Sequence, residues 1–255
     1  MMKRFFSLLL PLMAILVLPN CDKQEHDFRG LKEPQPDSLT GTLISVSGTI
    51  GNHSYVDLGL PSGTKWAICN VGANFAWFYG DYFAWGEVEP KKFYNWGTYY
   101  WAEEADGPAN GIWLLRYGNN SMFGRVDFLF DLESNDDAAL VNWGKEWKMP
   151  TVDQQDELYD GCDWEWTDDF LGTGVAGVIG VSKENGNNIF LPAAGYCYNG
   201  NVYDKSLVCA FWSRSVNYDY CYDAGFLLFN RSESERLGGR FFGYSVRPVV
   251  AESQK

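Results

Sequence analysis

The sequence is poor in histidine and in positive charge. Its 255 residues include only two histidines, His26 and His53, and 20 Lys and Arg against 33 Asp and Glu, for a formal net charge of −13. Metal sites built on imidazole need two or three convergent histidines, so that class of metal chemistry is excluded. A strongly negative chain repels phosphate backbones, so we expect no nucleic-acid partner.

The N-terminal apolar run, from Phe5 to Leu18, is too short to span a bilayer comfortably. Lys3 and Arg4 precede it, and the segment that ends at Cys21 is similar to a bacterial lipobox, although Asn20 stands where a small residue is usual. We therefore predict a signal peptide over residues 1–20 and a lipidated Cys21, which places the protein at the outer membrane or cell surface. The alternative is a plain signal peptide followed by an incidental cysteine.

Cleavage after residue 20 would remove two basic residues and no acidic ones, which changes the charge of −13 to −15. Such a surface does not bind anionic lipid, so attachment would depend on acyl chains, at about 0.8 kcal/mol per buried methylene. Residues 21–40 are polar, with Pro34 and Pro36, and predict a flexible tether. Because no second linker or fixed-period repeat follows, we expect residues 41–251 to form one domain.

Local patterns in this domain predict an α+β fold with short strands, two helices and long loops. One helix is expected after Ser134 as N-cap, ending before Gly144, and the other from Thr151, with a capping box closed by Gln154, to Gly161. The Asn185-Gly186 pair predicts a hairpin turn. The expected strands are Thr42–Val46, Tyr55–Leu58, Lys65–Cys69, Val175–Val181, Asn188–Leu191, Phe226–Phe229 and Tyr244–Val250.

Several segments between about residues 51 and 250 have an order and spacing that are familiar from a known protein family. They are Tyr55-Val-Asp-Leu-Gly-Leu-Pro-Ser-Gly-Thr64, Trp66-Ala-Ile-Cys-Asn-Val-Gly-Ala73, Tyr79-Gly-Asp-Tyr-Phe-Ala-Trp-Gly-Glu87, Trp147-Lys-Met-Pro-Thr151, Phe190-Leu-Pro-Ala-Ala-Gly-Tyr196, Phe211-Trp-Ser213 and Gly243-Tyr-Ser-Val-Arg-Pro-Val249. Together they resemble the Fibrobacter succinogenes major paralogous domain, a family common in Bacteroidetes lipoproteins.

The resemblance implies a C-type lectin-like fold, alongside the formylglycine-generating enzyme group. It implies paired N- and C-terminal strands, two helices and a loop-rich face that carries the ligand site. Some relatives are variable proteins of diversity-generating retroelements, in which the segment from the Trp-Ser strand to the terminal Ser-Val-Arg-Pro-Val strand is the randomised binding surface.

Candidate catalytic groups do not match a known constellation, so we expect no enzyme and no cofactor. The late cysteines are spaced too widely for the copper site of the related oxidase, and Ser62 lacks a nucleophile elbow. The adjacent acids could in principle serve glycoside cleavage, although such pairs more often cap helices or face solvent. They are Glu103 and Glu104, Asp136 and Asp137, and Asp168 and Asp169.

Calcium is the metal that C-type lectins often use to bind sugars, but this sequence lacks the Glu-Pro-Asn, Gln-Pro-Asp and Trp-Asn-Asp ligand triplets of that subgroup. Glu133-Ser-Asn-Asp-Asp137 offers suitable oxygens. A helix N-terminus explains these residues equally well, and we assign no metal site.

The cysteines suit an oxidising compartment. Cys69 and Cys162 lie in framework segments and are a candidate disulfide, or two thiols buried side by side. With Cys21 lipidated, five cysteines remain, so at least one thiol stays free or pairs between molecules.

Aromatic residues carry the binding hypothesis. Trp66, Trp85, Trp143, Trp147 and Trp164 are expected in the core. Between Cys197 and Phe242, Tyr, Asn, Ser and Arg crowd together, which is the composition of an antibody paratope, although an ordinary tyrosine-rich loop face has it too. We predict that Ala224, Leu227, Phe229 and Val246 are inward framework positions. Period-two alternation supports the split, because Phe226 and Leu228 then lie on the strand face opposite Leu227 and Phe229. The predicted contiguous exposed surface is made of Arg214, Asn217, Tyr218, Tyr220, Tyr222, Phe226, Leu228, Arg231 and Phe242.

The function expected from these features is recognition or adhesion by a lipid-anchored extracytoplasmic protein that binds a protein or glycan ligand. The alternatives are a carbohydrate-active or formylglycine-generating-enzyme-like enzyme, with a deep pocket, and a structural subunit of a surface fibre, with a pairable strand edge.

Overall fold

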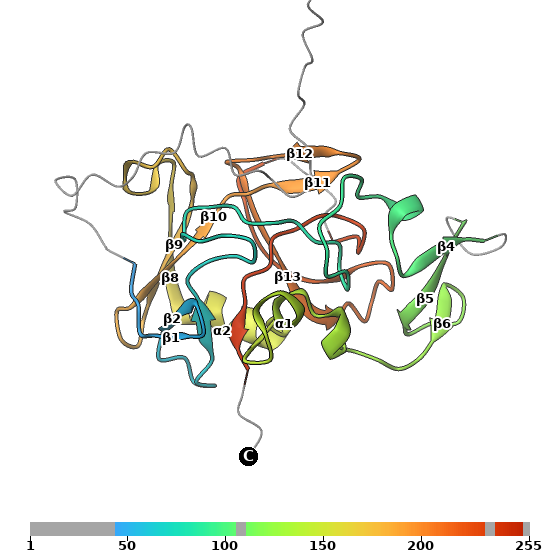
Figure 1. Ribbon diagram of the computed structural model, residues 1–255, viewed down its shortest axis with the longest axis horizontal. Coiled ribbons are helices and arrows are strands. Elements are labelled where there is room, and N and C mark those ends of the chain that lie inside the picture. Colours follow the sequence, from blue (N-terminus) through green and yellow to red (C-terminus); the bar gives the residue numbers. More distant parts are fainter. Residues whose placement is uncertain (1–43, 106–110, 233–237, 252–255) are drawn as a thin grey trace, which may run out of the picture.

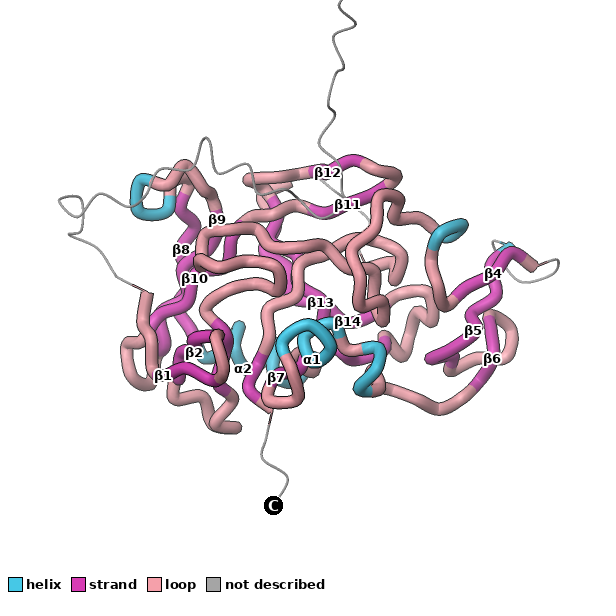
Figure 2. The backbone as a smooth tube through the Cα atoms, viewed as in Figure 1, coloured by secondary structure: helices cyan, strands magenta, loops and turns pink. Residues whose placement is uncertain are grey.

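The computed structural model describes residues 44–105, 111–232 and 238–251. Short antiparallel sheets and long loops dominate it, with two short α-helices, which confirms the α+β class (Figures 1 and 2). The predicted leader, tether and Cys21 lie outside the described residues, as do Thr42 and Leu43.

A five-stranded sheet joins the two ends of the domain. The C-terminal strand β15 lies between β3 and β7 and pairs Val249 with Trp66 and with Lys148. The N- and C-terminal strands therefore share one sheet, but they do not pair directly as the family resemblance implies, because β2 and β3 lie between β1 and β15. In sheet order the strands are β1 (Gly48–Ile50), β2 (His53–Asp57), β3 (Lys65–Ala67), β15 (Val249–Val250) and β7 (Trp147–Lys148).

A second antiparallel sheet contains the predicted hairpin, with Gly186 at φ 74° in its turn. Its strands, in sheet order, are β10 (Asn188–Pro192), β9 (Gly177–Ser182) and β8 (Cys162–Thr167). A third sheet, drawn at the right of Figure 1, was not expected from the sequence. It is made of β4 (Ala102–Glu104), β5 (Ile112–Gly118) and β6 (Gly124–Val126).

The remaining strands form two hairpins. The first pairs β11 (Tyr196–Tyr198) with β12 (Asn201–Tyr203), and the second pairs β13 (Val208–Val216) with β14 (Ala224–Asn230). The short 3-10 helices are η3 (Trp96–Thr98), η5 (Ser134–Asp136) and η6 (Phe170–Gly172).

The two α-helices differ in how well local sequence fixes their ends. Helix α2 (Val152–Gly161) begins at Thr151 with the predicted capping box and ends as expected. Helix α1 (Ala138–Trp143) begins later than predicted. Its N-cap is Asp137, whose carboxylate accepts from the amides of Ala139 and Leu140, and Ser134 lies in η5 instead.

Some expected strands also differ from the prediction. Strand β3 ends at Ala67 rather than Cys69, and two other segments differ more. Residues 44–47 are not in a strand: Ile44 packs beside Phe190, and the Ser45 hydroxyl accepts from the Asn188 amide. In the segment 244–250, β15 covers only its last two residues, and Tyr244 forms an isolated bridge with Phe83.

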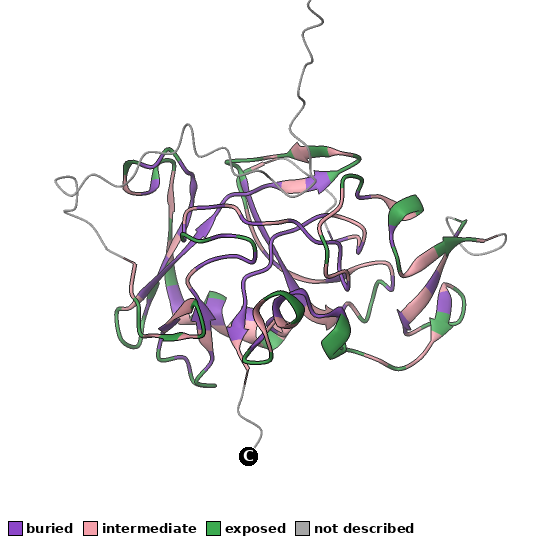
Figure 3. Ribbon diagram, in the orientation of Figure 1, coloured by how far each residue is buried: buried purple, intermediate pink, exposed green. Residues whose placement is uncertain are grey.

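The core contains two large clusters that meet at the β13–β14 hairpin, whose buried centre is visible in Figure 3. Leu227 and Phe211 belong to the first cluster, and Trp212 and Ala224 belong to the second. Among the five tryptophans expected in the core, Trp143 and Trp164 are only half-buried, whereas the others are fully buried; these are Trp66, Trp85 and Trp147.

Candidate functional site

The turn between β13 and β14 carries the most exposed residues of the predicted binding surface. Tyr218 is 64% exposed and Tyr220 is 68% exposed. The Asn217 side chain holds the turn, because its Oδ1 accepts from the amides of Asp219 and Tyr220 at 2.9 and 3.1 Å. Such side-chain turns fix the backbone locally and leave the intervening side chains in solvent.

A strap formed by residues 127–132 lies along the edge of β13 and extends this surface. The Val216 amide donates to the Phe130 carbonyl at 2.8 Å, and the Leu132 amide donates to the Arg214 carbonyl at 2.9 Å. Phe130 stacks on Tyr218 with ring centroids 4.9 Å apart and planes at 23°. The Phe130–Tyr218 pair therefore joins the strap to the turn.

We call the exposed residues of the strap and turn the aromatic face: Phe128, Phe130, Tyr218 and Tyr220. The turn is also held by Asn119, the residue after β5, because Asn119 Nδ2 donates to the Tyr218 carbonyl at 3.0 Å. Rings presented on a fixed backbone lose little conformational entropy on binding.

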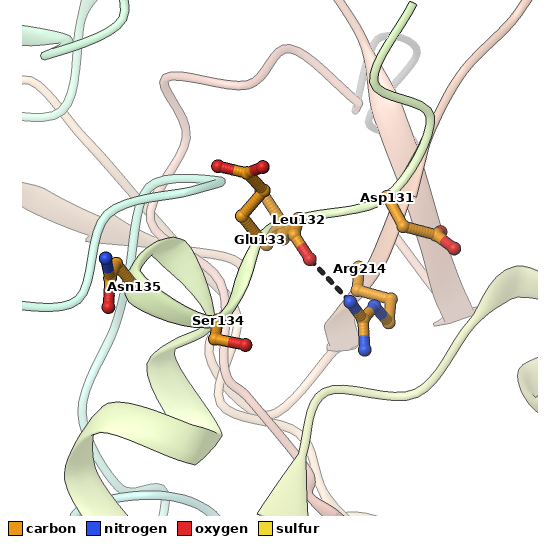
Figure 4. A pocket seen from close by; sticks show the side chains of 6 residues that line it. All are labelled: Asp131, Leu132, Glu133, Ser134, Asn135 and Arg214. Atoms are coloured by element: carbon orange, nitrogen blue, oxygen red, sulfur yellow. Dashed lines mark hydrogen bonds between the residues drawn. The ribbon is translucent and has the colours of Figure 1, made fainter.

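An open hollow of about 480 Å³ borders the aromatic face. The Arg214 guanidinium enters it and donates from Nη2 to the Leu132 carbonyl, while Figure 4 shows the Glu133 carboxylate directed away from it. The Nε of Arg214 is buried without a hydrogen-bond partner among the described residues. The lining residues are Asp131, Leu132, Glu133, Ser134, Asn135 and Arg214.

A charged network behind the hollow fixes η5. Arg116 forms ion pairs with Glu133 and Asp136, and the Tyr117 hydroxyl also donates to Asp136. Burial, followed by this hydrogen bond, raises the pKa of Tyr117 above its ordinary range, so the phenol stays protonated at neutral pH. The network therefore holds Glu133 and Asp136, which flank the lining residues Ser134 and Asn135.

The remaining predicted residues do not join this surface, so the expectation of one contiguous exposed face is wrong. Phe226, Leu228 and Phe242 are half-buried against the second core cluster, and Phe226 lies 5.5 Å from the Tyr244 ring. Tyr222 is half-buried as well, with its hydroxyl donating to the Ile112 carbonyl. The alternation itself was predicted correctly, but both faces of β14 are covered by protein.

Arg231 lies beyond the other end of β14, roughly 20 Å along the strand from the turn at about 3.3 Å per residue. There it pairs with Asp168 at 3.1 Å. The inward residues behave largely as predicted: Phe229 is half-buried against the first cluster, and the other three are buried, namely Ala224, Leu227 and Val246.

The candidate disulfide is not formed. Cys162 packs in the first core cluster, whereas Cys69 packs in a separate cluster with Ala73 and Phe78, and both are free thiols. Burial raises the pKa of both thiols, that of Cys162 to about 11. Because the two cysteines pack in different clusters, their positions in the sequence, one after a strand and one after a helix, did not predict a disulfide.

Two of the adjacent carboxylate pairs have structural partners. Asp137 caps α1 and also accepts from the Met149 amide, while Asp136 binds Arg116. Asp168 accepts from Trp166 Nε1, and Asp169 accepts from the Gly174 amide. Within the described ranges no group of three or more His, Cys, Asp and Glu side chains could hold a metal ion.

Sequence reasoning missed the strap, which supplies half of the aromatic face. The apolar run Phe128-Leu-Phe130 between Asp127 and Asp131 was a signal, since it lies in the long interval between the motif segments that end at Glu87 and begin at Trp147. An insertion between framework segments is a common place for binding residues.

Comparison with protein-family models, with curated proteins and with solved structures found no match. The family resemblance and the C-type lectin-like fold therefore stay predictions. In the part of the chain that the structure describes, no helix has the length and apolar character needed to cross a bilayer.

Proposed function

We propose that this protein is a recognition protein, anchored outside the cytoplasm by lipid at Cys21, and that its aromatic face binds a protein or glycan ligand. The observation that carries the proposal is the exposed Phe130–Tyr218 stack beside Tyr220 on a turn held by Asn217. Exposed rings held together without a folding role are typical of interaction sites.

The hollow beside the face supports the same function. Its lining is mostly polar, with Arg214 and Ser134 as donors, and the neighbouring aromatic face adds apolar contact area; binding sites combine apolar surface with a few placed polar groups. Both a peptide and a sugar present acceptors and flat apolar surfaces. The proposed fold is the C-type lectin-like domain, which carries its ligand site on loops.

The test uses the mature chain on a glycan array and against a displayed peptide library. For any ligand that is selected, Tyr220→Ala should lower affinity by about 2 kcal/mol, or about 30-fold, because a central aromatic anchor is lost. Tyr203→Ala is the matched control, since Tyr203 is 41% exposed on β12, outside the face. Equal losses in the two variants, or no selected ligand, would contradict the proposal.

The anchor is tested separately. Replacing Cys21 by Ser should release the protein from the membrane fraction, because the acyl chains have no other attachment point. If Cys21→Ser protein stays membrane-bound after cleavage of the leader elsewhere, the lipoprotein proposal is wrong.

A further inference from the structure

A second set of rings lies half-exposed where α2, β8 and the end of β14 meet. We call Tyr159, Phe229, Trp164 and Trp166 the aromatic row. Phe229 lies 5.7 Å from Tyr159 and 4.5 Å from Trp164, measured between ring centroids, and Tyr159 is 51% exposed. Trp164 and Trp166 are two residues apart on β8 and so share one face of the strand.

The row is rigid. Trp164 Nε1 donates to the Tyr159 carbonyl at 2.9 Å, and Trp166 Nε1 donates to Asp168 Oδ1 at 3.0 Å. Trp164, Trp166 and Phe229 also pack against the first core cluster on their inner sides. Their exposed edges are therefore fixed before any ligand arrives.

Negative charge predominates around the row, although Lys183 pairs with Asp163 at 3.8 Å. Residues 149–182 contain no Lys or Arg, whereas the segment from α2 to η6 contains eight acids. Asp156 lies three residues before Tyr159 on an exposed helix face, and Asp168 follows Trp166 with its side chain 82% exposed. The eight acids are Asp153, Asp156, Glu157, Asp160, Asp163, Glu165, Asp168 and Asp169.

One cation of the chain already occupies an end of the row. The Arg231 guanidinium lies over the Trp166 ring at 5.2 Å and pairs with Asp168 at 3.1 Å. Arginine is suited to this site because its planar group stacks on a ring while its N–H groups bind a carboxylate. The contact shows how this surface receives a guanidinium.

We propose that the aromatic row is a docking surface for an arginine-rich segment of a partner protein. Guanidinium groups of the partner stack on the exposed rings and pair with the acids at their rim, as Arg231 does. This site is independent of the aromatic face: β8 and the third sheet lie on opposite sides of the molecule in Figure 1, and Asn119, which follows β5 of the third sheet, contacts the turn of the aromatic face.

The test measures binding of a short peptide of alternating arginine and glycine to the mature chain, with a peptide of citrulline and glycine as the uncharged probe. Trp166→Leu should weaken binding about tenfold, through loss of the cation–π contact, and Asp168→Asn about threefold. Arg231→Gln should strengthen binding about threefold, because it frees Trp166 and Asp168 for the peptide. A purely structural role of Arg231 would not produce this gain.

Matched controls separate the site from general charge attraction. Glu103→Gln and Lys145→Gln each remove one exposed charge from other surfaces and should change affinity by less than the corresponding Asp168 and Arg231 variants. Unchanged thermal midpoints establish that the variants are folded, and Tyr220→Ala should leave peptide binding intact. Equal binding of the citrulline peptide, equal effects in the controls, or no saturable binding would each overturn the proposal.

Discussion

Arg247 donates from Nε to Oδ1 of Asn70 over 2.8 Å, and both side chains are fully buried. Its other nitrogens donate to the carbonyls of Ala67 and Phe190, at 3.1 Å each. Burial lowers the pKa of Arg247 to about 10, which still leaves the guanidinium charged at neutral pH. One cation thus joins the C-terminal segment to the segments after β3 and in β10.

This arrangement explains why separate sequence motifs occur together. Arg247, Asn70 and Phe190 each come from a different motif segment, and Asn70 Nδ2 also donates to the carbonyl of Tyr79 in a fourth. Next to Tyr79, Gly80 has φ 74°, and a Cβ there would lie 2.3 Å from the Val71 carbonyl oxygen. The motif residues therefore build the framework, and the residues of the aromatic face lie between the motif segments.

Replacing Arg247 by Lys should destabilise the protein by about 3 kcal/mol or more, because a lysine retains the charge but leaves buried acceptors unpaired. Urea unfolding at neutral pH measures the change. Arg231→Lys is the control, since its side chain is 54% exposed and its exchange should alter stability by less than about 1 kcal/mol. Similar losses in the two variants would show that the Arg247 geometry is unimportant.

Local signals in the sequence were sufficient where the interacting groups are neighbours. The capping box of Thr151 and Gln154 fixed the start of α2, and Asn185-Gly186 fixed the β9–β10 turn. The start of α1 was misplaced because Asp137 is held by the Met149 amide, a contact that the preceding residues do not reveal.

The candidate site could be predicted only in part for the same reason. Alternation separates Leu227 from Phe226 and Leu228, but it does not reveal that the second core cluster covers the opposite face of β14. Likewise, the pairing of Phe130 with Tyr218 depends on a strap far away in sequence. The amino-acid composition identified the turn that carries Tyr218. Only the tertiary structure identified the strap, which supplies the other half of the aromatic face.

His53 should make stability depend on pH. Its ring stacks on Trp143 with centroids 3.6 Å apart, and burial lowers its pKa below the ordinary value of 6.5. Because the unfolded chain binds the proton more readily, this contribution is fully present above about pH 6.5 and is lost as the pH falls. The wild type should lose more stability between about pH 7 and 5 than His53→Phe, which keeps an aromatic ring but does not titrate. Parallel stability curves for the two proteins over this range would contradict the prediction.

Asn217→Ala should loosen the turn of the aromatic face without unfolding the domain. The substitution removes the acceptor of the Asp219 and Tyr220 amides, and a lost hydrogen bond of about 1 kcal/mol corresponds to a roughly fivefold faster exchange of these amides. Hydrogen exchange of the segment 217–223 measures this change. Exchange in β9 and β10 should stay the same, and a uniform increase over both regions would indicate global destabilisation instead.

The five described cysteines should all be unreactive thiols in the native protein. Cys69, Cys162, Cys197, Cys209 and Cys221 are buried, and no disulfide joins any two of them. Burial raises the pKa of Cys162 to about 11, so little thiolate forms at pH 8, and exclusion of solvent slows attack further. In a Cys21→Ser chain, an aromatic disulfide reagent should therefore react slowly before urea is added and with five thiols per chain afterwards, without reductant. Three thiols after unfolding would instead reveal one disulfide, and rapid reaction before urea would show that a thiol is accessible. The unfolded titration thus decides between five thiols and a core in which two cysteines, such as Cys69 and Cys162, form a disulfide.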